Sequence, residues 1–469
     1  MCPTPSQPDS PVQHPKVAVL GCGSLFFGRQ AIWQMVHSPH LNTGTLALVD
    51  TDQHRLTRMA ELARKVVDDT GVKLAIEASC DRKDVLADCD FVVLTFATDS
   101  VKYRDIDCKL SAKYGIRMCS GDTVGPGGIL RTLRALPEAL TVARDVEDIC
   151  PDAWVINYIN PTASIGLGLK RYASNLKSFA LCDGNRMPNV RHRNAVRAGV
   201  IKSESDYTDE TDRKLDLHIG GPNHFTWLYK ASYDGRDILP NIAESIRRED
   251  LEKTPDPQAG PKQKYNGKVI CQLYNIYGAI PTAAGHTKEY VRFWQGLGKT
   301  PEPIPPITLW DASARYKRHD AMWQQVDDLL SGSIPISKYM EMFESDHATD
   351  IIETMAAGMQ RQFYINTLND GAIGNMGNDR FMELLCDVDA SGPKTVSVGD
   401  VPAGLRGLWA QVLDAHELAA EAAVTGQHNL LRRAMLTDPL VSSIADAEAL
   451  IDELLVAEQQ VLPNCWQGS

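Results

Sequence analysis

A short apolar run at Lys16–Leu20 ends in the glycine turn Gly21–Ser24, and helical apolar spacing follows from Ala31 to His37. This order predicts a strand, a tight turn and a helix. Two glycines in such a turn let backbone amides approach a pyrophosphate at the helix N-terminus, where the partial charge is positive. A third glycine at the usual spacing is missing, because position 26 is Phe. The turn alone is weak evidence for nucleotide binding, so the interpretation depends on the elements that follow it.

A second apolar strand is predicted at Thr45–Val49, and it ends in Asp50. An acidic residue at this distance hydrogen-bonds the adenosine ribose in dinucleotide-binding units, and it would repel a 2′-phosphate. We therefore expect NAD rather than NADP. The structural alternative is that the glycines only make a tight turn. The candidate cofactor-binding residues are Gly21, Gly23, Ser24, Asp50 and Thr95.

Strands and helices alternate through the first half of the chain, which predicts a doubly wound parallel sheet. The second half is predicted to be mixed α/β and largely helical. The expected fold class is therefore α/β, with an N-terminal Rossmann-type domain and a C-terminal domain. The predicted boundaries are a disordered tail at 1–15, an NAD-binding domain at 16–185 and a domain for substrate, metal and oligomerisation at 186–469.

Further elements are predicted from periodicity. Helices are expected at Arg55–Asp69, Asn189–Ala198, Lys288–Leu297, Met340–Gln362, Leu405–Thr425 and Ala445–Glu458, and strands at Lys73–Ala78, Phe91–Phe96, Ala153–Ile159, Leu215–Ile219 and Thr395–Val398. The segment Gly121–Gly128 holds four glycines and a proline, so we expect it to be irregular before a long amphipathic helix begins.

Charge and cysteine content restrict the partners of the chain. Its 469 residues include 48 basic and 60 acidic side chains, and the net charge of −12 disfavours non-specific binding to nucleic acid or anionic membranes. Eleven cysteines without a CxxC pair indicate thiols in a reducing compartment, so we expect a cytoplasmic location. No apolar run approaches the roughly 20 residues needed to span a bilayer.

A thiol and a carboxylate, Cys182 and Asp183, follow the apolar run Phe179–Leu181. Open α/β sheets bind ligands at the C-terminal ends of their strands. His224 lies in a glycine-bounded turn, and a thiolate with an imidazole would form half of the coordination shell of a divalent transition metal. The alternatives are a core cysteine followed by a helix cap, and a buried core histidine. Asn160, before a proline, could hold a polyol hydroxyl or only make a turn.

Together these motifs resemble glycoside hydrolase family 4, the NAD- and metal-dependent glycosidases related in fold to lactate and malate dehydrogenases. The resemblance runs from about Lys16 to about Glu458. It is carried by Gly21-x-Gly23-Ser24, Gly125-Pro126-Gly127-Gly128-Ile129-x-Arg131, Pro151-Asp152-Ala153, Asn157-Tyr158-x-Asn160-Pro161, Cys182, Asn223-His224, Glu289-Tyr290 and Asn369-Asp370-Gly371.

The resemblance implies a redox route to hydrolysis, the family being an exception to the usual pair of carboxylates. NAD⁺ would oxidise C3 of the sugar, and Mn²⁺ or a similar ion, held by Cys182 and His224, would polarise the resulting ketone. Tyr290 would remove the C2 proton, Asp183 would protonate the leaving group, and water addition and re-reduction would follow. Arg131, Asn160 and Asn223 are the expected substrate-binding residues. A homodimer or homotetramer is also implied.

The expected role of Tyr290 as a base depends on its pKa and on the residues that orient it. A tyrosine can act as a base only if its pKa falls from about 10, and a nearby metal cation is one cause. His286 would share a helical face with Tyr290 and could orient it. Tyr265, Tyr274 and Tyr277 are alternative bases.

The substrate is indicated by two motifs that resemble different branches of the family. Gly128–Arg134 is similar to the melibiase and α-glucosidase branch, whereas the acid Asp183 is found in α-specific phosphoglucosidases but is here followed by Gly184-Asn185. We expect an α-glycoside of an unphosphorylated hexose or uronic acid. The alternatives are a 6-phospho-α-glucosidase, an NAD-dependent 2-hydroxy-acid or polyol dehydrogenase, and an NAD-binding sensor without activity.

Overall fold

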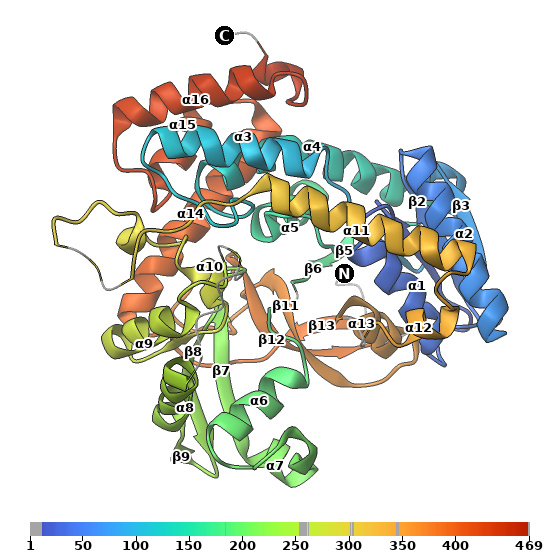
Figure 1. Ribbon diagram of the computed structural model, residues 1–469, viewed down its shortest axis with the longest axis horizontal. Helices are drawn as coiled ribbons and strands as arrows, with labels where there is room; N and C mark the ends of the chain where they lie inside the picture. The colour runs from blue at the N-terminus through green and yellow to red at the C-terminus, as the bar shows by residue number, and fades with distance from the viewer. Residues whose placement is uncertain are drawn as a thin grey trace, which may run out of the picture.

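The computed structural model describes residues 12–182, 184–252, 260, 262–300, 302, 304–343 and 347–467. Within them one 13-stranded sheet runs through both halves of the chain, and helices cover its faces (Figure 1). Its strand order is β10-β8-β7-β12-β11-β6-β5-β4-β1-β2-β3, with β13 beside β12 and β9 beside β8. The sheet therefore has a parallel half and an antiparallel half.

The parallel half has the order β3-β2-β1-β4-β5-β6, which is the order of dinucleotide-binding folds. Every neighbouring pair within it is parallel. This confirms the predicted fold class. The strands are β1 (Lys16–Leu20), β2 (Thr45–Val49), β3 (Ala75–Ser79), β4 (Phe91–Leu94), β5 (Trp154–Asn157) and β6 (Lys177–Ala180). Their connecting helices are α1 (Phe27–His37), α2 (Gln53–Thr70), α3 (Ser100–Lys113), α4 (Gly125–Ile149) and α5 (Thr162–Tyr172).

The antiparallel half joins the parallel half where Asn366 of β11 pairs with Ala180 of β6. Its strands are β7 (Leu215–Gly221), β8 (Trp227–Tyr233), β9 (Arg236–Asp237), β10 (Ile280–Pro281), β11 (Arg361–Leu368), β12 (Phe381–Asp389) and β13 (Gly392–Thr395). The backbone ladder thus continues past residue 185, where a domain boundary is predicted. That boundary stays a prediction.

The remaining helices surround the antiparallel strands and cover the parallel half. They are α6 (Asn189–Arg197), α7 (Asp209–Lys214), α8 (Leu239–Glu252), α9 (Asn266–Tyr277), α10 (Ala284–Thr287), α11 (Ala312–Ser331), α12 (Ile336–Met340), α13 (His347–Ala356), α14 (Ala403–Thr425), α15 (His428–Thr437) and α16 (Ile444–Glu458). Short 3₁₀ turns occur at Arg82–Asp84, Glu204–Asp206, Arg292–Trp294 and Asn464–Trp466. Helix α11 returns to the first half and packs on α2 and α3 (Figure 1).

Local sequence accounts for the ends of several elements. Helix α2 begins where the Asp52 side chain accepts hydrogen bonds from the amides of His54 and Arg55, and it ends at Gly71 with a left-handed φ of 71°. Strand β1 is buried along Val17–Leu20, as expected of a central parallel strand covered on both faces.

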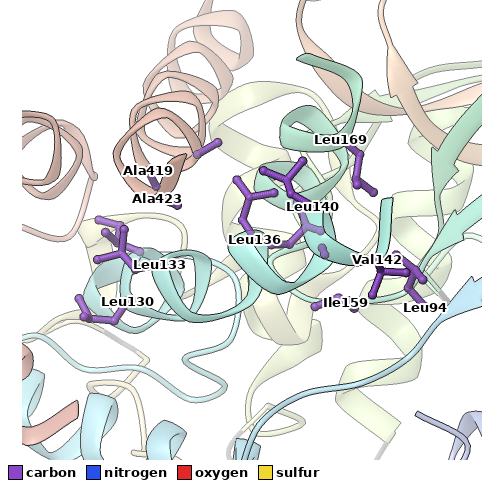
Figure 2. Close-up of a cluster of buried hydrophobic side chains, with 14 of the residues drawn as sticks. Leu94, Leu130, Leu133, Leu136, Leu140, Val142, Ile159, Leu169, Ala419 and Ala423 are labelled. Carbon is purple, nitrogen blue, oxygen red and sulfur yellow. The ribbon is translucent and has the colours of Figure 1, made fainter. Parts of the chain in front are cut away.

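Helix α4 is the centre of the largest apolar core (Figure 2). Leu130, Leu133, Leu136 and Leu140 recur at helical spacing and are buried between the sheet and α14, which contributes Ala419 and Ala423. Burying one leucine contributes about 1.5–3 kcal/mol, so these side chains fix α4 firmly. The segment that precedes α4 is thereby positioned at the sheet edge.

The structure corrects four predicted elements. Gly125–Gly128 is not irregular, because α4 already begins at Gly125. An added Cβ at Gly128 would lie 2.5 Å from the carbonyl carbon of Thr123, so glycine there permits close packing of the preceding loop. Beyond α10 the chain forms a turn and a short 3₁₀ segment, so the helix predicted at Lys288–Leu297 is wrong.

The other two corrections concern the last third of the chain. The helix predicted at Met340–Gln362 is wrong beyond α13, since strand β11 begins at Arg361. The strand predicted at Thr395–Val398 instead ends at Thr395. In both cases tertiary pairing with β12 overrides the local pattern.

Residues 1–11 of the predicted disordered tail lie outside the described residues. Of the remainder, the Val12 amide donates to the Ala356 carbonyl (2.9 Å), and the Pro15 carbonyl accepts from the Thr45 amide (3.0 Å). Across the described ranges, no helix combines the length and the apolar character that crossing a bilayer requires.

A buried ion cluster fastens the C-terminal helix to the first half. Arg134 of α4 donates to Asp107 of α3 (2.9 Å) and to Glu458 at the end of α16, and both carboxylates are fully buried. Burial raises the pKa of Glu458, and the negative charge of Asp107 adds to that rise. One guanidinium therefore neutralises the Asp107 carboxylate and hydrogen-bonds to Glu458, whose raised pKa favours its protonated form.

We expect Arg134→Met to lower the free energy of unfolding by about 3–5 kcal/mol, because it leaves the buried Asp107 carboxylate without a cation and Glu458 without its donor. Urea denaturation would measure the change. The matched control is Arg432→Met, which breaks an exposed pair with Glu448 and should cost less than about 1 kcal/mol. Equal effects of the two substitutions would contradict a structural role for the buried cluster.

Candidate functional site

The glycine turn after β1 brings together the five predicted cofactor-binding residues. Gly21 has a φ of 92°, and a Cβ there would lie 2.6 Å from the Phe96 amide nitrogen. The Gly23 amide donates to Asp50 Oδ2 (2.8 Å), and Thr95 Oγ1 donates to the Gly21 carbonyl (3.0 Å). The Ser24 amide donates to the Gly21 carbonyl (2.9 Å). Three strand ends therefore converge on one turn.

Gly28 has the packing role that the third glycine of a dinucleotide-binding turn has at the usual spacing, where this chain has Phe26. A Cβ on Gly28 would lie 1.9 Å from the Cys22 carbonyl oxygen, so only glycine allows α1 to approach the turn this closely. The glycine was missed because it comes two residues later than the usual spacing.

Phe26 lies beneath two arginines of α11. The guanidinium carbons of Arg315 and Arg318 are 4.5 Å and 4.8 Å from the centre of its ring. Burial and the neighbouring positive charges of Arg104 and Arg318 lower the pKa of Arg315 to about 10. Helix α11 thus adds positive charge beside the glycine turn, and sequence spacing gave no sign of it.

Asp122, His224 and His286 form a second cluster, and one potential ligand atom from each lies within 4.8 Å of the others. Asp122 lies between α3 and α4, His224 lies between β7 and β8, and His286 is in α10. The two imidazole rings stack with centres 4.0 Å apart and planes 13° apart. Three distant segments of the chain therefore present metal-binding groups to one point.

The pKa values of Asp122 and His224 are both lowered, which favours the protonation states that bind a cation. Burial opposes ionisation of Asp122, but the positive charge of Arg104, followed by that of His286, holds the pKa of Asp122 well below its usual range. Burial and the nearby His286 lower the pKa of His224 well below its usual range. A carboxylate and a neutral imidazole are both ready ligands for a divalent ion.

Glu289 holds this cluster together. Its fully buried carboxylate accepts hydrogen bonds through Oε2 from the amides of Cys119 (2.8 Å), Ser120 (2.8 Å) and Gly121 (3.3 Å). Its Oε1 lies 3.2 Å from Nδ1 of His286. Glu289 therefore fixes the backbone before Asp122 and orients His286, as carboxylates beside metal-binding histidines do.

Glu383 of β12 connects the loops that follow β6 and β7. Asn185 donates to its Oε1 (2.6 Å), and Asn223 donates to its Oε2 (3.2 Å). All three side chains are buried. Asn185, unusual beside Cys182 in the sequence, thus holds the Cys182 loop against the His224 turn.

Three polar atoms here are buried without a hydrogen-bonding partner among the described residues. They are Asn185 Oδ1, Asn223 Oδ1 and His224 Nδ1. Buried polar atoms are nearly always satisfied, so groups left without partners indicate a position for a bound ligand or ion. The His224 nitrogen fits a metal ion.

Cys182 lies just beyond β6 and is partly buried. A negative charge on its sulfur would raise the pKa of Tyr290, as the charges of Glu289 and Asp122 do. Its sulfur is not part of the mutual cluster of Asp122, His224 and His286 within the described residues. Asp183, the expected acid, lies outside the described residues.

Tyr290 is 1% exposed and sits in a turn rather than a helix, so it shares no helical face with His286. Its hydroxyl donates to the Asn223 carbonyl (2.9 Å), and its ring stacks on Phe225 at 5.0 Å. Burial raises the pKa of Tyr290 well above its usual range, although the nearby Thr123 opposes this. Without a cation nearby the hydroxyl therefore keeps its proton.

Arg131 and Asn160, both expected to bind substrate, are in direct contact. Nε of Arg131 donates to the Asn160 carbonyl (2.9 Å), and the Asn160 side chain accepts from Thr162 (2.8 Å). Burial lowers the pKa of Arg131 to about 10. The third expected residue, Asn223, lies beside His224 and Glu383 instead.

Two family models match the chain. The model described as family 4 glycosyl hydrolase matches residues 16–191, and the model of the family 4 C-terminal domain matches residues 219–441. The chain belongs to glycoside hydrolase family 4. The family membership and the glycosidase class expected from the motifs are thereby confirmed.

Relatives with different names are similar along nearly the whole chain. A Bacillus subtilis (strain 168) protein named probable 6-phospho-beta-glucosidase is 28% identical over 96% of this chain and 97% of its own length. An alpha-galactosidase of the same organism is 28% identical over 96% of this chain and 99% of its own length. An alpha-galacturonidase of Lachnoclostridium phytofermentans is 26% identical over 96% and 97%. These names differ in both anomer and sugar.

A solved structure also shares this fold. The 6-phospho-alpha-glucosidase from gut microorganisms, in complex with NAD and Mn²⁺, has a TM-score of 0.78 and is 20% identical. The match covers 96% of this chain and 99% of that one. At this identity the likeness supports the fold.

Gly28→Ala should lower the free energy of unfolding by about 1–3 kcal/mol and weaken NAD⁺ binding, because α1 must move away from the glycine turn. Thermal unfolding and isothermal titration would measure the two effects. The matched control is Gly407→Ala in α14, where an added Cβ meets open space. That variant should be at least as stable as the natural protein, since alanine favours helix.

His416 should make stability depend on pH. Its Nε2 donates to the Thr123 carbonyl (2.8 Å), and burial lowers its pKa to about 4, against about 6.5 in an unfolded chain. The unfolded state therefore binds a proton before the folded state does, and stability is lost as pH falls from about 7 to about 4.

We expect acidification from pH 7.5 to 5 to destabilise the natural protein by about 2 kcal/mol more than His416→Gln. Denaturant unfolding at the two pH values would measure this difference. Burial lowers the pKa of His347 to about 3. Because His347 is present in both proteins, its contribution cancels in the difference between them. The exposed His54 gives the control His54→Gln, which should behave like the natural protein. An unchanged pH dependence in His416→Gln would contradict the assignment.

Proposed function

We propose that the chain hydrolyses an α-glycosidic bond of an unphosphorylated hexose or uronic acid, using NAD and a divalent metal ion such as Mn²⁺. The observation that carries this proposal is the cluster of Asp122, His224 and His286, in which a buried His224 nitrogen has no hydrogen-bonding partner within the described residues. An ordinary hydroxy-acid dehydrogenase needs no such metal-binding group, which disfavours that alternative.

The residues around the glycine turn fit NAD. Gly21 and Gly28 allow the turn to pack closely against Phe96 and α1, and Asp50 lies beside Gly23, where an adenosine ribose would be hydrogen-bonded. Arg315 and Arg318 add positive charge near the same turn. We propose Gly21, Gly23, Ser24, Asp50 and Thr95 as cofactor-binding residues.

Cys182 and His224 are the proposed metal ligands, with Asp122 and His286 as further donors. Imidazole, carboxylate and thiolate groups together suit a divalent transition ion. When bound, NAD⁺ would accept hydride from the sugar, and the metal ion would serve as a Lewis acid beside the sugar oxygens. Glu289 would keep His286 in position as the ion binds.

Tyr290 is the proposed base and Asp183 the proposed acid. Tyr290 must surrender its hydrogen bond to the Asn223 carbonyl before it can accept a substrate proton. A positive charge bound beside Asp122 would offset the negative charges that raise the pKa of Tyr290. Arg131, Asn160 and Asn223 are the proposed substrate-binding residues, and the two asparagines offer both donors and acceptors to hydroxyl groups.

The α preference is supported by Asp183 and by the Gly128–Arg134 motif, and relatives named alpha-galactosidase and alpha-galacturonidase agree with it. A 6-phospho-α-glucosidase is the second candidate, because a phosphoglucosidase shares this fold. We further propose a homodimer or homotetramer in the cytoplasm. The described cysteines form no disulfide, which suits a reducing compartment.

Hydrolysis in D₂O should place deuterium at C2 of the released sugar, because a base removes that proton and solvent replaces it. Aryl α- and β-glycosides, glucuronides, galacturonides and their 6-phospho counterparts would be supplied with NAD⁺, Mn²⁺ and a reductant, and NMR would read the label. The active compound would settle anomer and sugar. Accumulation of NADH in proportion to product would instead establish a dehydrogenase.

Cys182→Ser and Tyr290→Phe should each reduce hydrolysis at least about a thousandfold while NAD⁺ affinity stays within about twofold, since neither residue lies at the glycine turn. Initial rates and isothermal titration measure the two effects. Full activity in either variant would remove that residue from the mechanism. Tyr265→Phe, at an exposed tyrosine, is the matched control and should retain activity.

A further inference from the structure

A cavity of about 370 Å³ opens beside His286, away from the glycine turn in the fold. Its walls come from α6, α8, α9 and strands β8 and β10, and the segment Thr282–His286 forms one side. His286 belongs both to this cavity and to the cluster with Asp122 and His224. A molecule bound at the cluster can therefore extend into the cavity.

The charges that line the cavity have one sign. Arg193, Arg197 and Lys262 line it with His286, and no Asp or Glu is among its described lining residues. This contrasts with the net charge of −12 for the whole chain. The ionisable side chains among the described lining residues are thus cationic, on a protein that is acidic as a whole.

Two of these cations form no ion pair with a carboxylate of the described residues, although the charges of Glu204 and Glu249 act on Arg193 from a longer distance. Arg197 pairs with Glu249 of α8 through Nη2 and Oε2 (2.9 Å). Neither Arg193 nor Lys262 has a carboxylate within 4.0 Å in the part of the chain that the structure describes, and Lys262 instead lies 3.1 Å from Nε2 of His286. An anion entering the cavity would therefore meet Arg193 without an ion-pair partner among the described residues, with Lys262 held beside His286.

The start of α9 adds further positive character. Asn266, its first residue, lines the cavity, and a helix N-terminus presents backbone donors and a partial positive charge. This contribution reinforces the two arginines and the lysine. It also places amide donors close to them.

The rest of the cavity is apolar and larger than a single carboxylate needs. Leu228, Ile246, Ile270, Ile280 and Pro281 contribute its apolar walls. At roughly 30 Å³ per water molecule, the volume corresponds to about a dozen waters, which is enough for a ring that carries an acidic group. A ring would pack on these walls while its charge faces Arg193.

We propose that this cavity binds the leaving group of the glycoside and that it selects a leaving group with a carboxylate on a ring. This inference rests on the proposed function, since it places the sugar at the cluster and its aglycone beyond His286. Arg193 determines the specificity by pairing with the carboxylate. Lys262, which lies beside His286, adds a second positive charge.

The test compares 4-carboxyphenyl and 4-nitrophenyl glycosides of whichever sugar proves active. Arg193→Gln should lower kcat/KM for the carboxylated compound about ten- to a hundredfold, as expected for loss of a charge-assisted hydrogen bond, and should change the neutral compound less than about twofold. The control Arg248→Gln, at an exposed residue of α8 outside the cavity, should affect neither. An equal loss on both compounds would overturn the proposal.

A second comparison locates the negative charge. Hexosides and uronides that share one neutral aryl group differ only at C6, and Arg193→Gln should affect them equally. A selective loss on the uronide would place the charge on the sugar and would overturn the leaving-group assignment.

Direct binding separates this inference from the proposed function. The full-length protein loaded with NAD⁺ and Mn²⁺ would be titrated with 4-hydroxybenzoate, the product of the carboxylated compound. Binding that weakens about tenfold or more in Arg193→Gln but not in Arg248→Gln supports the cavity even if no glycoside is hydrolysed. Equal binding to all three proteins would overturn it even if hydrolysis is found.

Discussion

The buried carboxylate of Glu289 is the interaction on which the candidate site most depends. Three consecutive backbone amides, from Cys119 to Gly121, point at one of its oxygens, and His286 is held by the other. A fully buried carboxylate without such donors would be strongly destabilising, so folding of the loop and placement of the imidazole occur together. The position of Asp122 follows from the same contacts, because it comes directly after Gly121.

A second carboxylate, Glu383, repeats this logic on the neighbouring strands. By holding Asn185 and Asn223 it joins the Cys182 loop to the His224 turn. The site therefore depends on two buried acids that are remote from each other in sequence. The sequence indicates only one of these two acids. Glu289 belongs to a recognised motif, whereas Glu383 appears only as a polar residue that interrupts an apolar strand.

The parallel half of the fold was predictable because its signals are local. Each strand is a short apolar run, and Gly21, Gly23 and Asp50 occur at the spacing that dinucleotide-binding units require. The antiparallel half was less predictable, since its strands depend on partners far away, as β11 does on β12. Tyr290 illustrates the limit at the site: the motif identified the residue, but its turn conformation and its hydrogen bond to Asn223 arise from tertiary contacts.

The continuous sheet also governs how the protein can move. The glycine turn follows β1, and Asp50 and Thr95 follow β2 and β4. Cys182 and His224 lie in the loops after β6 and β7. All five loops extend from strands of the same sheet. A hinge between the two halves would have to break the pairing of Asn366 with Ala180. The spacing between the glycine turn and the cluster of Asp122, His224 and His286 is set when the chain folds, so the entropic cost of bringing them together belongs to folding.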